Sequence, residues 1–356
     1  MNTKIFDIRN NTNWKSTLTE AAKMLAEGKI VAFPTETVYG LGANALNENA
    51  VQKIFEAKGR ASDNPLIVHI SSEEQLFPLV KEIPETAKLL MSHFWPGPLS
   101  MIFRKTDAVA GGITAGLSTV AVRIPQNEVA RYLIQESGCP IAAPSANLSG
   151  APSPTRAEHV IQDLDGKVDG IVLGDPCEVG LESTVIDLTV SPPAILRPGM
   201  ITKEQIESVI GPVQFDAGSA EINSVPKSPG MKYVHYAPKA SVVLFQGSLE
   251  EMVEGITKEV EIALQDQKWT GIIASDETIT IYREKFPQPS VLIYSAGSRY
   301  QMKTIAHNLF YIFREMDQQK VDIIFSESFE ESGIGLAVMN RMKKAAKKIQ
   351  DKENPL

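Results

Sequence analysis

The chain contains few cysteines and has no long apolar segment. Its 356 residues include only two cysteines, Cys139 and Cys177, and no Cys-x-x-Cys pair, so we expect no structural zinc site, which needs about four Cys or His ligands. Two isolated thiols are typical of a reducing compartment. The N-terminus lacks an apolar signal core, and no apolar run approaches the ~20 residues of a membrane span. We therefore expect a cytoplasmic protein without a membrane partner.

Basic residues are also outnumbered. The 35 Lys and Arg residues face 43 Asp and Glu residues, for a net charge of −8, which argues against a general nucleic-acid binder but leaves a local basic patch open. The P-loop, the Gly-x-Ser-x-Gly elbow and the His-Glu-x-x-His motif are all absent. The five histidines show no ligand spacing, so we expect no dedicated metal site, and any metal would be Mg²⁺ carried by a nucleotide.

Helix and strand patterns alternate along most of the chain, and its length fits about two domains. Residues 1–211 predict an α/β domain with a mixed sheet, because some connections are too short for crossovers. Residues 212–239 are rich in Gly, Ser, Pro and Asn and are predicted to form a linker. Strand–helix repetition over residues 240–350 predicts a smaller domain with a parallel sheet.

Local signals predict individual helices. Candidate helix starts lie at Thr17 with Glu20, at Asn47, at Thr155 with Glu158, and at Thr202 with Gln205. Apolar periodicity predicts further helices over residues 71–80, 84–94 and 336–349. Two glycine pairs, at residues 40–42 and 333–335, loosely match dinucleotide loops but lack an acidic partner after a second strand. We interpret both as tight turns before helices.

The richest stretch is residues 33–42, Phe-Pro-Thr-Glu-Thr-Val-Tyr-Gly-Leu-Gly. It leaves a predicted buried strand over residues 30–33 and concentrates hydroxyl groups, a carboxylate and a phenol. The carboxyl ends of strands are where α/β folds place ligands. A ligand site is favoured over the alternative, an ordinary polar turn.

Two sets of cations stand out. Lys58 and Arg60 flank a glycine at a predicted helix end, where they can neutralise a triphosphate or simply complement the helix dipole. Arg123 lies on an apolar strand, on the same face as Thr119. A buried arginine needs an anion, and both a protein carboxylate and a ligand carboxylate remain open as its partner.

Small polar loops follow other predicted strands. Hydroxyl and amide groups in the stretch from Ala143 to Ser153, and around Ser183, can bind phosphate or ribose, although ordinary loops remain the alternative. Arg197 begins an Arg-Pro-Gly turn, where a solvated arginine is the alternative. Residues 228–238 of the linker carry aromatic residues, a His and a Lys, which are unusual in a passive spacer.

Together these motifs resemble the YrdC-like family. The resemblance rests on residues 33–42, Lys58-x-Arg60, residues 64–69, residues 95–99, Val122-Arg123-x-Pro125, Pro144-Ser145-Ala-Asn147-x-Ser149-Gly150, Ser183-Thr184-Val and Arg197-Pro-Gly199. The motif at residues 228–238 and the second α/β domain resemble the longer, two-domain form of the family. This implies a twisted open sheet with a concave cavity over residues 1–211, a lid over the active site at 212–239, and a Rossmann-like domain over 240–350.

The resemblance also implies a reaction. A nucleotidyltransferase of this kind makes L-threonylcarbamoyladenylate and pyrophosphate from L-threonine, bicarbonate and ATP with Mg²⁺. The product serves N6-threonylcarbamoyladenosine formation in tRNAs that read codons starting with A, after a separate transferase complex receives it. An RNA-binding module is the alternative, and direct tRNA contact remains open. A hydrogenase-maturation carbamoyltransferase is excluded, because it would require zinc-finger cysteines.

The family's site residues carry over by motif. Those implied to position the reacting groups, without a protein nucleophile, are Lys58, Arg60, Ser145 and Asn147. Those implied to bind ATP are Lys58, Arg60, Asn64, Thr119, Ser145, Ser153, Arg197, His235 and Tyr236. Those implied to bind threonine are Thr37, His69, Arg123, Ala143 and Ser183, with Arg123 on the carboxylate.

Overall fold

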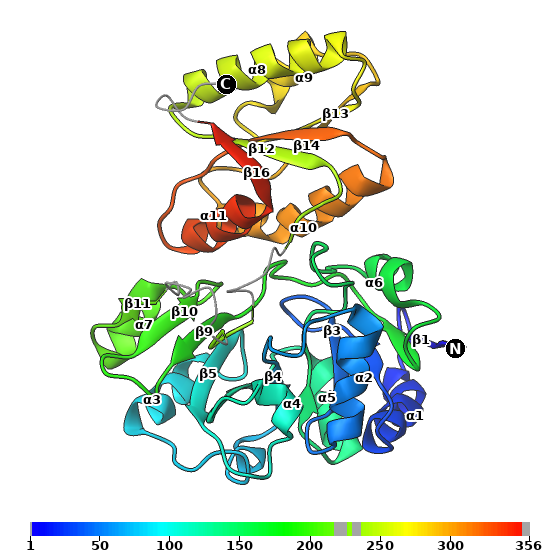
Figure 1. Ribbon diagram of the computed structural model, residues 1–356, viewed down its shortest axis with the longest axis vertical. Helices are drawn as coiled ribbons and strands as arrows, with labels where there is room; N and C mark the ends of the chain where they lie inside the picture. Colours follow the sequence, from blue (N-terminus) through cyan, green and yellow to red (C-terminus); the bar gives the residue numbers. More distant parts are fainter. Residues whose placement is uncertain (1, 217–225, 230–235, 351–356) are drawn as a thin grey trace. The chain divides into compact units, whose positions relative to one another are not determined.

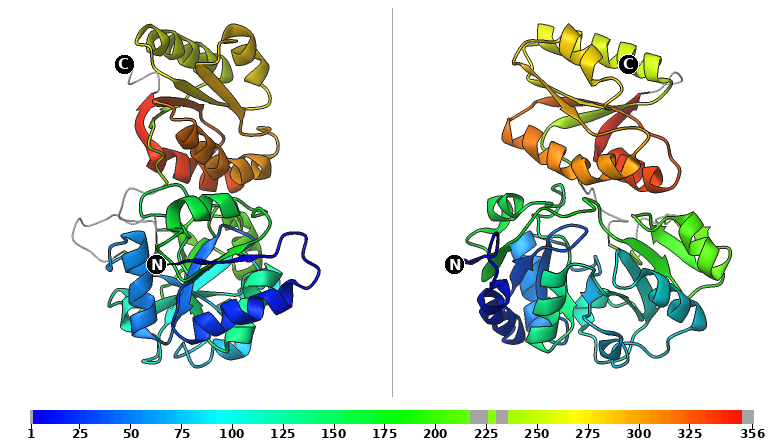
Figure 2. Two further views of the ribbon diagram at one scale, coloured as in Figure 1. Left: turned by 90° about the vertical axis from the view of Figure 1, so that its right-hand side faces the viewer. Right: turned by 180° about the vertical axis from the view of Figure 1, so that it is seen from behind.

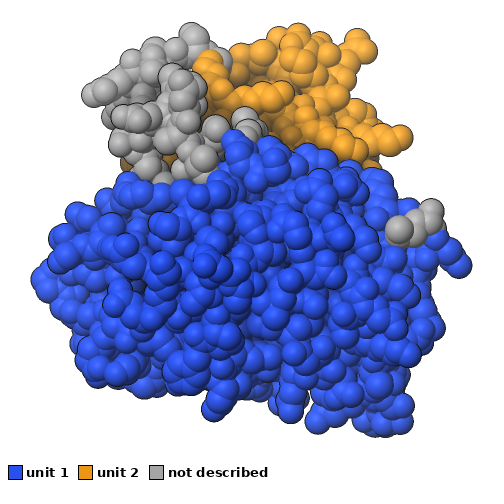
Figure 3. All heavy atoms as spheres, turned by 60° about the horizontal axis from the view of Figure 1, so that its bottom comes forward, with its two compact units in different colours: residues 1–149, 153–233 blue, residues 150–152, 234–356 orange. Residues whose placement is uncertain are grey.

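A computed structural model describes residues 2–216, 226–229 and 236–350 of the chain. The chain divides into two compact units (Figure 3). Unit 1 comprises residues 1–149 and 153–233, and unit 2 comprises residues 150–152 and 234–356. Each unit has its own sheet, and the predicted α/β fold class is confirmed. Among the described residues, no helix is both long and apolar enough to cross a membrane.

Unit 1 is built on a mixed sheet of eleven strands. In spatial order these are β1 (Lys4–Asp7), β8 (Gly170–Leu173), β2 (Val31–Phe33), β3 (Gly40–Asn44), β7 (Ile141–Ala142), β4 (Ile67–His69), β6 (Thr119–Arg123), β5 (Leu99–Arg104), β9 (Thr184–Asp187), β10 (Ala194–Arg197) and β11 (Gln214–Phe215). The sheet contains both parallel pairs, such as β4 with β6, and antiparallel pairs, such as β5 with β6. The strand β11 lies within the predicted linker.

Helices pack on both faces of this sheet. They are α1 (Trp14–Ala26), α2 (Glu48–Lys58), α3 (Glu85–Phe94), α4 (Gly111–Thr114), α5 (Glu128–Ser137), α6 (Ala157–Leu164) and α7 (Lys203–Ile210). Helices α1 and α5 lie side by side (Figures 1 and 2) and bury Leu25 and Leu133 against Phe33. The neighbouring Ala32 belongs to the other core, with Ile54 of α2, because successive strand residues face opposite sides of the sheet.

Unit 2 has a parallel sheet of five strands. In spatial order these are β14 (Val291–Ser295), β13 (Thr270–Ala274), β15 (Ile323–Glu327), β12 (Ser241–Phe245) and β16 (Ala346–Gln350). Helices α8 (Leu249–Gln265) and α9 (Ile279–Lys285) cover one face, and α10 (Met302–Gln318) and α11 (Ile334–Ala345) cover the other (Figure 1). This is the predicted parallel-sheet arrangement.

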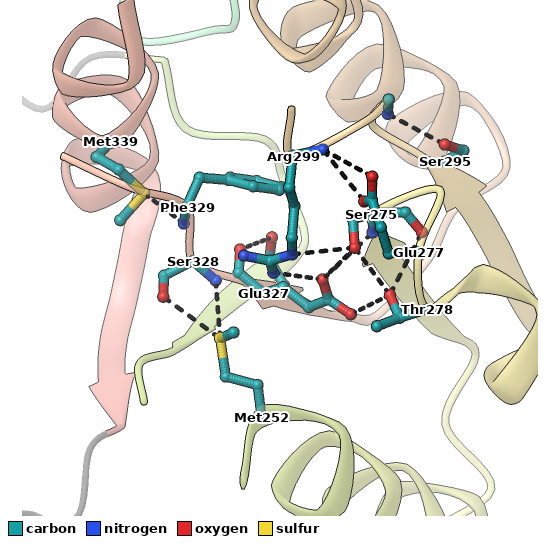
Figure 4. A network of polar contacts seen from close by, with 12 residues as sticks. Met252, Ser275, Glu277, Thr278, Ser295, Arg299, Glu327, Ser328, Phe329 and Met339 are labelled. Carbon is teal, nitrogen blue, oxygen red and sulfur yellow. Dashed lines mark hydrogen bonds and ion pairs between the residues drawn. The ribbon is translucent and has the colours of Figure 1, made fainter. Parts of the chain in front are cut away.

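A partly buried ion pair lies at the carboxyl ends of the unit 2 strands (Figure 4). Arg299 Nη2 lies 2.6 Å from Glu327 Oε2, and Arg299 Nε donates to Ser275 Oγ at 3.1 Å. Thr278 Oγ1 donates to the other Glu327 oxygen, and the Arg299 guanidinium stacks over Phe329, 4.9 Å from the ring centre. Because the two charges neutralise each other, we interpret this cluster as a structural contact that holds together the segments after β13, β14 and β15.

Two of the four predicted helix starts are confirmed. Asn47 accepts a hydrogen bond from the Ala50 N–H at the start of α2, and Thr202 with Gln205 forms a reciprocal capping box before α7. The other two predictions are wrong. Helix α1 begins at Trp14, so Thr17 lies inside it, and α6 begins at Ala157, two residues after Thr155. Both capping patterns fall out of register with the helix that forms.

Three further predictions fail where tertiary pairing overrides local preference. Residues 71–80 contain only a short 3-10 turn, and residues 346–350 leave the predicted closing helix to pair with β12 as β16. Residues 40–42 are strand and not a turn before a helix. A side chain at Gly42 would place its Cβ 2.5 Å from the Phe33 ring, so this glycine allows β2 and β3 to pack closely.

A substitution at Thr202 tests whether its side chain stabilises the start of α7. We expect Thr202→Ala to destabilise α7 by about 1 kcal/mol, because the Gln205 N–H loses its acceptor. Hydrogen exchange of the α7 amides should then accelerate about fivefold. Thr202→Ser keeps the hydroxyl and should exchange close to the wild-type rate. Equal exchange in all three proteins would contradict a capping role.

Candidate functional site

The stretch predicted to be functional is buried and polar. Thr35, Glu36 and Thr37 follow β2, and each is at most 3% exposed. The loop is held from outside by main-chain bonds: Val179 N donates to Glu36 O at 2.8 Å, and Gly180 N donates to Thr37 O at 3.1 Å. An ordinary exposed turn would not need to bury a carboxylate and two hydroxyl groups.

Arg123 lies against this loop. Its Nη1 is 3.2 Å from Glu36 Oε1, and its Nη2 donates to Thr37 Oγ1 at 3.1 Å. The parallel pairing of β4 with β6 places His69 beside Arg123 at the strand ends. Glu36 is therefore the protein carboxylate that one of the two sequence alternatives required. Three residues that the family motifs predict for threonine binding, Thr37, His69 and Arg123, come together.

This pairing leaves three buried polar atoms without a hydrogen-bond partner. They are Glu36 Oε2, His69 Nδ1 and Arg123 Nε. An unsatisfied buried donor or acceptor costs about 1–3 kcal/mol, and native proteins retain few of them. Three such atoms in one cluster are therefore more typical of a binding site than of a structural core.

Burial sets the protonation of the cluster. Burial and the adjacent charge of Arg123 hold the pKa of His69 well below its ordinary value, so this imidazole is neutral at pH 7. Burial also lowers the pKa of Arg123, while Glu36 acts in the opposite direction. Arginine remains charged under such shifts, so the cluster holds one cation, one anion and one neutral imidazole.

Several strand ends bring more polar side chains to the same edge of the sheet. Antiparallel β5 begins beside the end of β6 and contributes Ser100, β9 follows Ser183, and β10 ends at Arg197. Ser100 Oγ and Ser183 Oγ are 2.8 Å apart. Arg197 donates to Ser183 O at 3.0 Å and to Ser183 Oγ at 3.1 Å. Sequence-predicted Ser183 and Arg197 are therefore in direct contact.

The Lys58 motif meets the Ser145 motif. Lys58, 2% exposed at the end of α2, donates from Nζ to Ser145 O at 2.5 Å and to Asn147 O. Ser145 Oγ donates to Asn147 Oδ1 at 2.5 Å. Arg60 lies near this group along the chain and donates to Asn64 O at 3.3 Å. The Lys58-x-Arg60 motif and the Ser145-Ala-Asn147 motif are thus joined by hydrogen bonds from Lys58 to main-chain carbonyls.

The remaining predicted residues are placed differently. Ser153 Oγ donates to Glu182 Oε1 at 2.5 Å, beside Ser183. Ala143 is buried and donates from its main-chain N–H to Ile67 O at 3.0 Å. Thr119 begins β6, about 13 Å along the strand from Arg123, so it lies outside the Arg123 cluster.

The two linker residues have separate outcomes. His235 lies outside the described residues. Tyr236 belongs to unit 2, where it is buried, stacks on Phe310 with ring centres 5.3 Å apart, and lies beneath the Arg341 guanidinium. Its predicted contact with the nucleotide stays a prediction.

Sequence reasoning missed Glu36, Ser100 and Glu182. Glu36 stood inside the stretch that was singled out, and Arg123 was known to need an anion. The carboxylate of Glu36, between two threonines of that stretch, could therefore have been predicted as the partner of Arg123. Ser100 and Glu182 carried no comparable signal, because each reaches the polar cluster only through a partner far away in sequence.

Comparison with known proteins identifies the family of both parts of the chain. Residues 23–199 match the Sua5, YciO and YrdC family model, described as telomere recombination. Residues 201–347 match the model described as the C-terminal domain of threonylcarbamoyl-AMP synthase. The two matches together account for both units of the chain.

Similar proteins extend over nearly the whole chain. The threonylcarbamoyl-AMP synthase of Bacillus subtilis (strain 168) is 51% identical over 330 residues, covering 92% of each chain. That of Pyrococcus abyssi is 48% identical and covers 94% of each. A crystal structure of P. abyssi Sua5 complexed with L-threonine superposes with a TM-score of 0.90, at 46% identity, over 98% of this chain and 99% of that one.

The chain therefore belongs to the threonylcarbamoyl-AMP synthase family, in its two-domain form. The predicted family and enzyme class are confirmed.

The ion pair between Arg123 and Glu36 predicts that losing Arg123 destabilises the protein more than losing a surface arginine does. Arg123→Ala should lower the free energy of unfolding by about 3–5 kcal/mol, because it leaves Glu36 buried without its cation. Arg104→Ala is the matched control, since Arg104 pairs with Glu82 on the surface and should cost no more than about 1 kcal/mol. Urea unfolding measures both. Equal losses would contradict the importance of the pair.

His69 predicts a pH dependence of stability. Below pH ~6.5 the unfolded chain binds a proton at His69 that the folded chain does not, so the free energy of unfolding should fall by up to ~1.4 kcal/mol per pH unit until the lower folded pKa is reached. His69→Gln should remove this part of the slope, measured by urea unfolding between pH 7.5 and 5. The exposed-site variant His93→Gln should keep the slope. A His69→Gln slope like the wild type's would refute this account.

Proposed function

We propose that the chain forms L-threonylcarbamoyladenylate and pyrophosphate from L-threonine, bicarbonate and ATP, the reaction that its family name describes. The observation that carries this proposal is the Arg123 cluster, a buried group of charged and polar side chains that keeps unpartnered atoms. Such a cluster suits a small polar ligand. The P. abyssi relative whose structure contains L-threonine supports threonine as that ligand.

The chemistry asks for positioning more than for a protein nucleophile. The ammonium group of threonine first loses a proton, and the resulting amine captures bicarbonate with loss of water to give a carbamate. A carbamate oxygen then attacks the α-phosphorus of ATP while pyrophosphate leaves. Phosphoryl-type transfer depends mainly on alignment and charge neutralisation. Hydroxyl groups and fixed cations, as found around Ser145 and Ser183, suit that demand.

We assign the nucleotide to the residues around Lys58 and Ser145. Lys58, Arg60 and Asn64 would hold the phosphates, with Ser145, Ser153 and Arg197 nearby. The support is that Lys58 already meets the Ser145–Asn147 segment, and that the buried Asn64 Oδ1 has no partner. Thr119, His235 and Tyr236 complete this assignment from the family motifs.

ATP enters as its Mg²⁺ complex in this proposal, so the metal belongs to the substrate. The product would pass to a tRNA threonylcarbamoyl transferase complex. A mixed anhydride of a carbamate and a phosphate is a reactive acylating species, which makes a transferase the expected class of consumer.

Pyrophosphate release tests the reaction. Incubation with ATP and Mg²⁺ should release pyrophosphate only when L-threonine and bicarbonate are both present, because carbamate formation precedes attack on the α-phosphorus. Mass spectrometry should detect the adenylate in the same samples. Equal release without threonine would refute the assignment.

Arg123 should discriminate between the two substrates. We expect Arg123→Lys to weaken threonine binding by ~10–100-fold, because lysine keeps the charge but loses the guanidinium that presents Nε. ATP affinity should change less than about threefold. Isothermal titration of the full chain measures both. A larger loss for ATP than for threonine would show that the carboxylate site is misplaced.

A further inference from the structure

The three unpartnered atoms of the Arg123 cluster differ in chemical character. Arg123 Nε is a donor on a cation, Glu36 Oε2 is an acceptor on an anion, and His69 Nδ1 belongs to an imidazole held neutral by burial. Each side chain is less than 5% exposed. The cluster therefore offers one cationic, one anionic and one neutral hydrogen-bonding position.

L-Threonine carries one matching group for each position. Its carboxylate suits Arg123 Nε, its ammonium suits Glu36 Oε2, and its hydroxyl suits the neutral His69. We infer that Glu36 binds the ammonium group of threonine and is a specificity residue of this site. The inference rests on the proposed function, which supplies threonine as the ligand.

The geometry around Glu36 supports a double role. Its Oε1 contacts Arg123 Nη1 at 3.2 Å, while its Oε2 stays unpartnered. One oxygen therefore orients the arginine, and the other remains for the ligand. The loop that carries Glu36 is fixed by the Val179 and Gly180 main-chain bonds, so the carboxylate does not depend on the ligand for its position.

Charge balance makes the site selective for a zwitterion. Arg123 and Glu36 neutralise each other before any ligand arrives. A ligand with a carboxylate alone would bury an extra negative charge and leave Glu36 Oε2 unpartnered, and an amine alone would do the reverse. Only a ligand with both charges satisfies both atoms and keeps the cluster neutral. Sites that hydrogen-bond a substrate group reject analogues that lack it.

The test pairs a protein change with a ligand change. Glu36→Gln keeps the shape of the side chain and removes its charge. (R)-3-Hydroxybutanoate keeps the carboxylate and hydroxyl of threonine and lacks the ammonium. Threonine and 3-hydroxybutanoate are each titrated against the full-length wild type and the Glu36→Gln variant. Where 3-hydroxybutanoate binds too weakly for direct titration, its affinity is measured by competition with threonine. Asp187→Asn is the matched control, because Asp187 is an equally buried carboxylate of unit 1 with partners at Thr189.

We expect wild type to bind threonine at least ~30-fold more tightly than 3-hydroxybutanoate, and Glu36→Gln to reduce that ratio at least ~10-fold. Asp187→Asn should leave the ratio unchanged. An equal loss for both ligands would show that Glu36 only orients Arg123, and no loss would remove it from the site. Either result overturns the inference while leaving threonine binding, and thus the proposed function, intact.

Two further measurements cover a variant that does not fold. The wild-type ratio needs no substitution, and a preference for threonine below about threefold would refute ammonium binding by itself. Glu36→Asp keeps the charge on a shorter side chain and should retain more of the preference than Glu36→Gln. If wild type binds no threonine at all, the proposed function fails and not merely the role of Glu36.

Discussion

The ion pair between Arg123 and Glu36 is the interaction on which the polar centre of unit 1 depends. A buried arginine at the end of an apolar strand is costly without an anion, and Glu36 supplies one from a loop 87 residues away. The pair joins the loop after β2 to the end of β6. Main-chain bonds from residues 179 and 180 then connect the same loop to the segment that leads into β9. The ion pair and these main-chain bonds together bring three of the predicted motifs close in space, those at residues 33–42, at Arg123 and before β9.

Local chemistry explains which elements were predictable. Asn47 and Thr202 act as caps because the hydrogen bonds involved reach only three residues along the chain. Residues 346–350 have a helical pattern but form β16, because pairing with β12 completes the edge of the unit 2 sheet. Propensity is a weak prior where a distant strand competes for the same residues.

The same distinction holds at the site. The residue types around Lys58, Ser145 and Arg123 could be read from the motifs, because family resemblance identifies residues one at a time. Their partners could not, since Ser100 meets Ser183 and Ser153 meets Glu182 only after the sheet has formed. The choice between a protein and a ligand carboxylate for Arg123 likewise required the fold. In the structure Glu36 accepts a hydrogen bond from Arg123 Nη1 and Thr37 accepts one from Nη2, while Nε has no hydrogen-bond partner.

The mutual neutralisation of Arg123 and Glu36 also has a consequence for how the proposed amino-acid and nucleotide substrates approach. Because Arg123 and Glu36 act as each other's counterion, distant ions experience almost no field from them, and little inorganic salt needs to leave when an amino acid enters. The proposed recognition of threonine there operates at contact range and is nearly independent of ionic strength. The proposed nucleotide region, with Lys58 and Arg60 facing a polyanion, belongs to the opposite regime, in which attraction extends over about a Debye length and weakens with salt. In the proposed reaction the amino acid and the nucleotide are thus attracted by electrostatic forces of different range.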